Sequence, residues 1–147
     1  MLVVITALSI FFFDYWIKSY ALAHLDYNIP VEIIPHIVWL RLVKNTGAAF
    51  GMLPDKPLLL AGIGAIFLFV IIGWLYRHSH VLSDKIACAL IIGGALSNLY
   101  DRIVRGFVVD YVDLGWWPVF NLSDSVICIG CGILIIRSFM EKGKCNG

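Results

Sequence analysis

The sequence predicts an all-α integral membrane protein of four transmembrane helices, with a small extracytoplasmic β-rich loop region between the first and second helices. Of its 147 residues, 61% are hydrophobic and only 14% are charged, whereas soluble domains have roughly 45–50% apolar and about 25% charged residues. A chain this short cannot hide so much apolar surface from water. The apolar residues also collect in four long stretches, which we expect to form one membrane-embedded domain over residues 1–147.

Each of these stretches has the length and composition of a membrane span, which requires about 20 mostly apolar residues in a helix. The first is interrupted by Asp14 and Lys18, and the second is uncharged throughout. The fourth has an acid at its start and a base near its end, and the third is short unless its helix begins near residue 83. The expected spans are residues 3–22, 57–76, 83–100 and 121–139.

The segment between the first two spans predicts strands rather than a helix. Three prolines interrupt it, and the run IVWLRLVKN mixes β-branched and aromatic residues with charged ones. We expect a short hairpin or curled sheet on the outer surface. Each side of the membrane would carry five basic loop residues, but the outer loops are longer, which weakens the weight of their charges. We therefore place both termini in the cytoplasm.

Asp14 and Lys18 form a charged pair inside the first span. They are four residues apart in the acid-then-base order that favours pairing on one helix face. We interpret them as a structural pair in which Lys18 reaches outward to the membrane surface, in preference to a catalytic pair. No Lys or Arg precedes this apolar run, so we also expect the segment to be retained and not cleaved as a signal peptide.

The end of the third span carries a second polar cluster. Asn98 and Arg102 are four residues apart, as are Asp101 and Arg105, so each pair shares a helix face. Taken alone, this is an ordinary polar helix end with a salt bridge. The small residues at 93–95 precede it and predict close contact with neighbouring helices.

Asp110 and Asp124 are expected at the same depth, the outer membrane surface. Asp110 lies in an extended stretch after the third span, and Asp124 lies at the start of the fourth. Two carboxylates held close together cannot both ionise cheaply, so one keeps a proton near neutrality, as in the aspartic proteases. The alternative is that Asp124 caps its helix and Asp110 is a solvated loop acid. Spacing alone leaves both interpretations open.

Neither a metal nor a nucleic acid is expected as a partner. The spacing of Cys128 and Cys131 is that of a redox or zinc pair, but no second cysteine pair or nearby histidine supports such a site. The net charge of +1 provides no broad basic field for nucleic acid.

Four sequence blocks, in their order along the chain, resemble the signal peptidase II family of bacterial lipoprotein signal peptidases. They are KNTGAAFG (44–51), GGALSNLYDR (93–102), GFVVDYVD (106–113) and FNLSDS (120–125). Any one block would be weak evidence, but the ordered set is specific. Together with the four spans, the resemblance covers the whole chain.

This resemblance implies an intramembrane aspartic endopeptidase of the bacterial cytoplasmic (inner) membrane, with no metal or organic cofactor. Its substrate would be a prolipoprotein whose cysteine carries a diacylglyceryl group, cut just before that cysteine at the extracytoplasmic face. Membrane lipids would be further partners, and the oligomeric state stays open. The family's catalytic aspartates fall on Asp110 and Asp124. Supporting positions fall on Asp14, Asn45, Asn98, Arg102 and Asn121, and Lys18, Gly47, Ala49 and Asp101 lie in the same motifs.

Four positions depart from the common family pattern. Ser97 stands in place of a glycine, Ser123 of an alanine, Tyr15 of a glutamine and Ile17 of a threonine. These changes bear on local packing and substrate preference, while every side chain with a proposed role is kept.

The alternative function is that of a small proton- or ion-conducting membrane subunit that uses its acids as a relay. A relay should place acids at several depths of the bilayer. The second and third spans lack acids in their interiors, and most acids of the chain cluster at one surface. The peptidase is therefore the preferred hypothesis.

Overall fold

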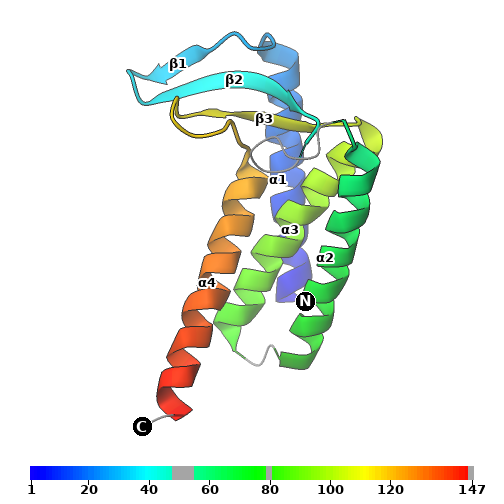
Figure 1. Ribbon diagram of the computed structural model, residues 1–147, viewed down its shortest axis with the longest axis vertical. Coiled ribbons are helices and arrows are strands. Elements are labelled where there is room, and N and C mark those ends of the chain that lie inside the picture. The colour runs from blue at the N-terminus through cyan, green and yellow to red at the C-terminus, as the bar shows by residue number, and fades with distance from the viewer. Residues whose placement is uncertain (48–54, 79–80, 146–147) are drawn as a thin grey trace.

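A computed structural model describes residues 1–47, 55–78 and 81–145 of the chain. Each of its long helices contains a segment with the length and composition to cross a membrane. The four-helix membrane fold expected from the sequence is therefore confirmed for the described residues. The helices are α1 (Leu2–His24), α2 (Pro57–His78), α3 (Leu82–Val104) and α4 (Leu122–Cys145), as Figure 1 shows.

The central helix of the bundle is α3, which packs against each of the other three. Of its spanning segment, 56% is buried within the protein, against 17% in each of the other spans. Two adjacent glycines permit this packing. A Cβ at Gly93 would lie 2.7 Å from the Ala7 carbonyl oxygen, and one at Gly94 would lie 2.6 Å from the Ser123 carbonyl oxygen. Small residues thus let α1 and α4 approach α3 closely, as their position in the sequence predicted.

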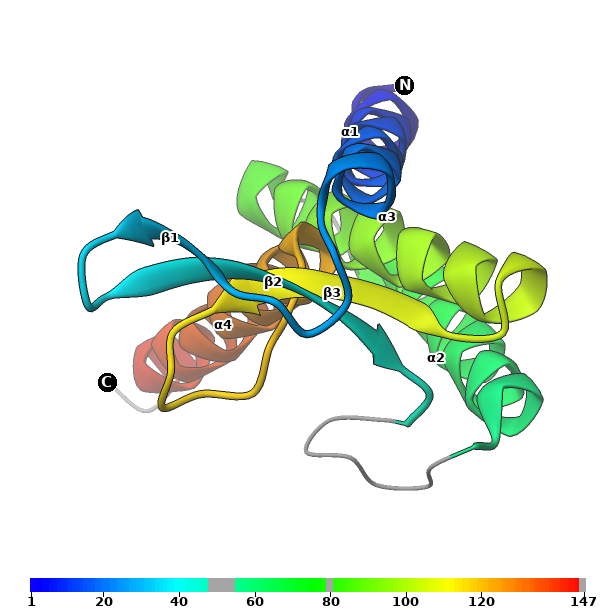
Figure 2. The same cartoon turned by 90° about the horizontal axis from the view of Figure 1, so that it is seen from above.

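A three-stranded antiparallel sheet, in the order β1–β2–β3, lies across one end of the bundle (Figures 1 and 2). β1 (Val31–Ile34) and β2 (Val38–Asn45) form the β-rich region expected between the first two helices. β3 (Val108–Asp113) comes instead from the connection between α3 and α4. It pairs with β2 in a register that sets Asp110 opposite Val43. The sheet therefore joins two connections that are distant in sequence.

A buried apolar cluster holds the sheet against the first helix. Its members are Ala21 from α1, Leu42 from β2, and Val109 and Tyr111 from β3. Removing these side chains from water favours the contact between α1 and the sheet. Val109 and Tyr111 flank Asp110, so this packing fixes the backbone that carries the acid.

Candidate active site

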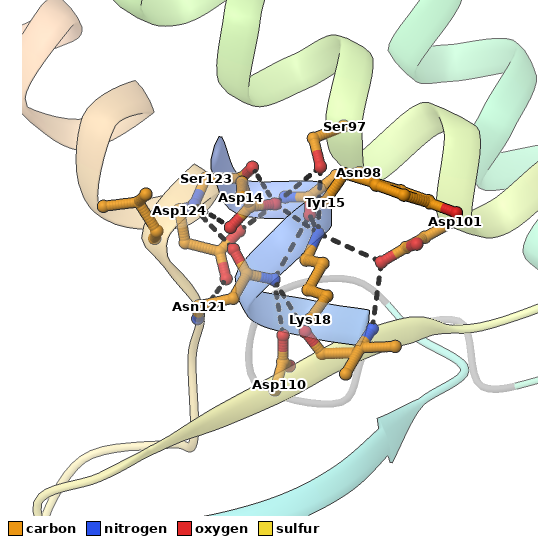
Figure 3. A network of polar contacts seen from close by, with 12 residues as sticks. Asp14, Tyr15, Lys18, Ser97, Asn98, Asp101, Asp110, Asn121, Ser123 and Asp124 are labelled. Atoms are coloured by element: carbon orange, nitrogen blue, oxygen red, sulfur yellow. Dashed lines mark hydrogen bonds and ion pairs between the residues drawn. The ribbon is translucent and has the colours of Figure 1, made fainter. Parts of the chain in front are cut away.

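The structure joins all ten predicted site residues in one network of hydrogen bonds and ion pairs at the sheet end of the bundle, and Figure 3 shows the part of it around Lys18 and Asn121. The network draws on three helices, two strands and the residues that adjoin them. Most of its members are buried, and buried polar groups are stable only when they have partners. The ten are Asp14, Lys18, Asn45, Gly47, Asn98, Asp101, Arg102, Asp110, Asn121 and Asp124.

Asp110 lies on β3 and is only 1% exposed, so it is not a solvated loop acid. One carboxylate oxygen accepts a hydrogen bond from Asn45 Nδ2 at 2.9 Å, and the other accepts one from Asn121 Nδ2 at 2.7 Å. Burial, and after it the negative charge of Asp124, raises the pKa of Asp110 from its ordinary value of 3.8 to about 7. Asp110 is thus a buried acid suited to holding or releasing a proton near neutral pH.

Asp124 lies in the first turn of α4 and is half-buried. Its Oδ1 accepts a hydrogen bond from Asn98 Nδ2 at 2.8 Å, and its Oδ2 accepts one from the Asn121 backbone N–H at 3.2 Å. In return, Asn121 Oδ1 accepts the backbone N–H of Asp124 at 2.9 Å, which makes a reciprocal cap at the helix start. Asp124 therefore caps its helix, and it also lines a cavity shared with Asp110.

Asn121 connects the two carboxylates. The Nδ2 group of its fully buried side chain donates to Asp110 and, at 3.2 Å, to Asn98 Oδ1. Its Oδ1 accepts the backbone N–H of Asp124, and its own backbone N–H donates to Asp124 Oδ2. An amide orients both acids without adding a charge that would neutralise either of them.

Lys18 points into the protein, so the expectation that it reaches outward to the membrane surface was wrong. It is 0% exposed, and its ammonium group lies 2.8 Å from Asp14, 3.0 Å from Asp101 and 2.8 Å from Asn98 Oδ1. These acceptors from α1 and α3 balance the cost of burying the charge. Asp101 also forms the expected ion pair with Arg105.

Arg102 and Gly47 connect the end of α3 to the chain that leaves β2. Arg102 Nη2 donates to the Gly47 carbonyl oxygen at 3.4 Å, and Nη1 donates to the Asn98 carbonyl oxygen at 3.3 Å. The Gly47 backbone N–H donates to Asn45 Oδ1 at 3.0 Å. The motif that contains Asn45 is thus tied to Asp110 and to Arg102. Ala49 lies outside the described residues.

A cavity of about 710 Å³ opens beside the two acids. Asp110, Asp124, Asn45 and Arg102 all line it, together with apolar residues of the loop before α4. Among the residues that the structure describes, no group of three or more His, Cys, Asp or Glu side chains is arranged to hold a metal ion. The site offers one buried and one half-buried carboxylate, each with directed amide donors, which is the chemistry of general acid–base catalysis.

The family of this chain is shown by its match to a family model over nearly its whole length. A family model described as signal peptidase (SPase) II matches residues 6–140. This chain belongs to the signal peptidase II family. The resemblance carried by the four sequence blocks is thereby confirmed.

Relatives within the signal peptidase II family are similar over most of their length. A lipoprotein signal peptidase of Vibrio cholerae serotype O1 is 42% identical over 149 residues, covering 92% of this chain and 85% of the relative. One from Syntrophomonas wolfei is 41% identical over 129 residues, covering 86% and 85%. A solved bacterial membrane enzyme superposes with a TM-score of 0.92 at 28% identity, covering 97% of this chain and 90% of its own.

Two serines that contact Asp14 belong to the network but were not predicted as site residues. Ser97 and Ser123 both donate hydroxyl hydrogen bonds to Asp14, at 2.5 and 2.7 Å. The sequence identified them only as departures from the signal peptidase II pattern that bear on local packing and substrate preference. The sequence does carry a signal that could have identified them, because Ser97 directly precedes Asn98 and Ser123 directly precedes Asp124. Both serines are buried.

Proposed function

We propose that Asp110 and Asp124 are the catalytic pair with which this chain hydrolyses a peptide bond. As a member of the signal peptidase II family it is a multi-pass membrane protease that removes signal peptides from lipoprotein precursors. The observation that carries the proposal is that two carboxylates from different elements line one cavity and share Asn121 as a partner. We find no support for an ion-conducting function.

The pair divides the work of an acid and a base. The ionised aspartate takes a proton from a water molecule, whose oxygen attacks the carbonyl carbon of the peptide. The protonated aspartate donates a hydrogen bond to the carbonyl oxygen, and the departing amine leaves with a proton supplied by the pair. The raised pKa of Asp110, about 7, supports a pair that holds one proton at neutral pH.

The surrounding polar residues keep this pair in position. Asn45 and Asn121 hold both oxygens of Asp110, and Asn98 holds Asp124. Arg102 lines the cavity while bound to the Gly47 carbonyl oxygen. We propose that Asn45 and Arg102 also orient the substrate backbone. Such preorganisation contributes to the rate because the reacting groups need little rearrangement.

We further propose that the substrate is a prolipoprotein whose cysteine carries a diacylglyceryl group and that cleavage occurs just before this cysteine. Lipid anchoring would fix the depth of the cysteine, so that one peptide bond reaches the pair. The site would lie at the extracytoplasmic face of the bacterial inner membrane, with both termini in the cytoplasm. The N-terminus and the C-terminal end of α4 both lie at the end of the bundle away from the sheet, which supports this orientation (Figure 1).

The test is cleavage by the purified chain in detergent. A diacylated precursor is incubated in the presence of EDTA, and the products are identified by mass. We expect a fragment that begins at the lipidated cysteine, and no product from a variant that carries both Asp110→Asn and Asp124→Asn. Activity that is lost in EDTA and restored by zinc would contradict the aspartic mechanism, and a product cut elsewhere would contradict the proposed substrate position.

A further inference from the structure

Ser97 and Ser123 are buried residues of the network that the proposed mechanism does not use. Ser97 on α3 donates its hydroxyl hydrogen to Asp14 Oδ2 at 2.5 Å, and Ser123 on α4 donates to the same oxygen at 2.7 Å. Their exposures are 2% and 0%. Figure 3 shows the two hydroxyls on either side of the Asp14 carboxylate. Two helices thus supply donors to one oxygen of an acid on a third helix.

Asp14 also fixes the start of α4. Its Oδ1 accepts the backbone N–H of Ser123 at 3.2 Å, which is the residue directly before Asp124. A carboxylate at this place accepts an N–H of the first helical turn that has no partner within the helix, and its negative charge interacts favourably with the helix dipole. Lys18 is the remaining donor to Oδ2, at 2.8 Å. The Asp14 carboxylate therefore has four donors, and two of them are serine hydroxyls.

Lys18 has three ammonium hydrogens to distribute. Its three short contacts are with Asp14, Asp101 and Asn98 Oδ1, while Ser97 Oγ is more distant at 3.3 Å. The contact with Asn98 fixes the orientation of that amide, whose Nδ2 donates to Asp124 at 2.8 Å. If Asp14 lost its hydroxyl donors, it would attract a second hydrogen of Lys18. Asn98 Oδ1 would then lose its short ammonium contact and keep only the longer hydrogen bond from Asn121 Nδ2, at 3.2 Å.

We propose that Ser97 and Ser123 are positioning residues for Asp124. By supplying two donors to Asp14, they leave one hydrogen of Lys18 for Asn98, which then orients the Asp124 carboxylate. An alanine at either position would have no hydroxyl with which to do this. Neither serine lines a described cavity, so their removal should lower turnover without weakening substrate binding. The inference rests on the proposed catalytic role of Asp124.

The experiment compares Ser97→Ala, Ser123→Ala and the double variant, with kcat and KM measured on a diacylated precursor and normalised to folded protein. Each single variant should lose about two- to threefold in kcat, because one hydroxyl remains, and the double variant about tenfold or more. KM should stay within about twofold of wild type. The matched control is Ser19→Ala, because the Ser19 hydroxyl donates to the Tyr15 carbonyl oxygen of its own helix, at 2.8 Å, outside the network.

Rescue adds a second readout that a purely structural role would not produce. In the Ser97→Ala background, Ser123→Thr keeps a hydroxyl and should preserve turnover that Ser123→Ala loses. If the double alanine variant does not fold, Ser97→Ala and Ser19→Ala decide the question, and equal kcat values overturn the inference. A folded double variant with wild-type kcat, or with a loss confined to KM, also overturns it. Failure of the wild-type chain to cleave would instead overturn the proposed function, and this inference with it.

Discussion

Two regions at opposite ends of the bundle each pair a basic side chain with two acids, but they differ in how deeply the charges are buried. At the end away from the sheet, Arg137 lies 3.3 Å from Asp84 and 2.7 Å from Glu141, and its side chain is 26% exposed. At the sheet end, Lys18 is fully buried between two acids, and its contacts lead through Asn98 to Asp124. The first region is a partly solvated ion pair, and the second is a buried network beside a cavity.

The difference indicates which charges are held for chemistry. A solvated ion pair contributes little stability, and its loss is correspondingly small. Buried charges are expensive unless every donor and acceptor is satisfied. A buried network is therefore a poor way to gain stability but a good way to fix the orientation of reacting groups. Substitutions at the two ends should separate these roles, because those at the sheet end should affect turnover and those at the other end only stability.

The largest effect is expected at the proposed catalytic pair. Asp110→Asn and Asp124→Asn each keep the size of the side chain but cannot exchange the catalytic proton. Each should lower kcat/KM on a diacylated precursor by about 10³-fold or more. Asp84→Asn, at the other end of the bundle, should keep nearly full activity. The measurement is initial cleavage rate per folded protein, followed by mass.

Substantial turnover by either sheet-end variant would remove that aspartate from the proposed mechanism. Comparable losses in all three variants would show that the two ends do not differ as we infer. Far-ultraviolet circular dichroism of each purified variant should match that of wild type, which controls for misfolding.

The second prediction concerns what the cavity recognises. The same precursor with and without diacylglyceryl on its cysteine is assayed at matched detergent concentration. We expect the unlipidated form to be cleaved about 10²- to 10³-fold more slowly, because nothing then holds its peptide bond beside Asp110 and Asp124. Equal rates would mean that the peptide sequence, and not the lipid, positions the substrate.

The third prediction follows from the raised pKa of Asp110. The folded protein binds this proton more tightly than the unfolded chain, so the contribution to stability is fullest below about pH 4 and is lost as the pH rises to about 7. Asp110→Asn lacks this loss. Between these pH values, the free energy of unfolding of Asp110→Asn should therefore rise by up to about 4 kcal/mol relative to that of wild type. Thermal unfolding in detergent across this pH range measures the gain, and parallel curves for the two proteins would contradict it.

The fourth prediction tests the amide that joins Lys18 to Asp124. Asn98→Ala should lower kcat by about 10- to 100-fold, because Asp124 loses a directed donor and Lys18 loses an acceptor. KM should change less than kcat, since the loss is one of orientation and not of substrate contact. A loss in KM alone would assign Asn98 to substrate binding.

Much of the fold could be predicted because the signals are local. Four apolar runs predicted four helices, and the run of small residues at 93–95 predicted close helix contacts. Strand β3 was harder to place, because an extended stretch carries no record of its partner. The pairing of β3 with β2 depends on Val108–Asp113 meeting a strand about 65 residues earlier, with Asp110 opposite Val43 and Val108 opposite Asn45.

The site likewise has features that could be predicted from local sequence and features that could not. Asp110 and Asp124 could be placed at one depth from helix lengths, and the structure brings them to one cavity. The direction of Lys18 could not be predicted, because it depends on how α1 is rotated toward Asp101 on α3. The convergence of two serines on Asp14 likewise requires three helices in register, which no single segment encodes.

The smallest effect is expected at the end away from the sheet. Arg137→Gln removes the guanidinium charge that contacts Asp84 and Glu141 but keeps an amide and most of the side-chain length. Glu141 is mostly exposed and Arg137 partly so, so solvent screens much of the interaction. We expect a loss of about 1 kcal/mol in the free energy of unfolding, a fall of a few degrees in melting temperature, and kcat/KM within about twofold of wild type. A loss of turnover like that of Asn98→Ala, without a larger loss of stability, would show that the two ends are coupled, and the distinction between a network held for chemistry and a pair held for stability would fail.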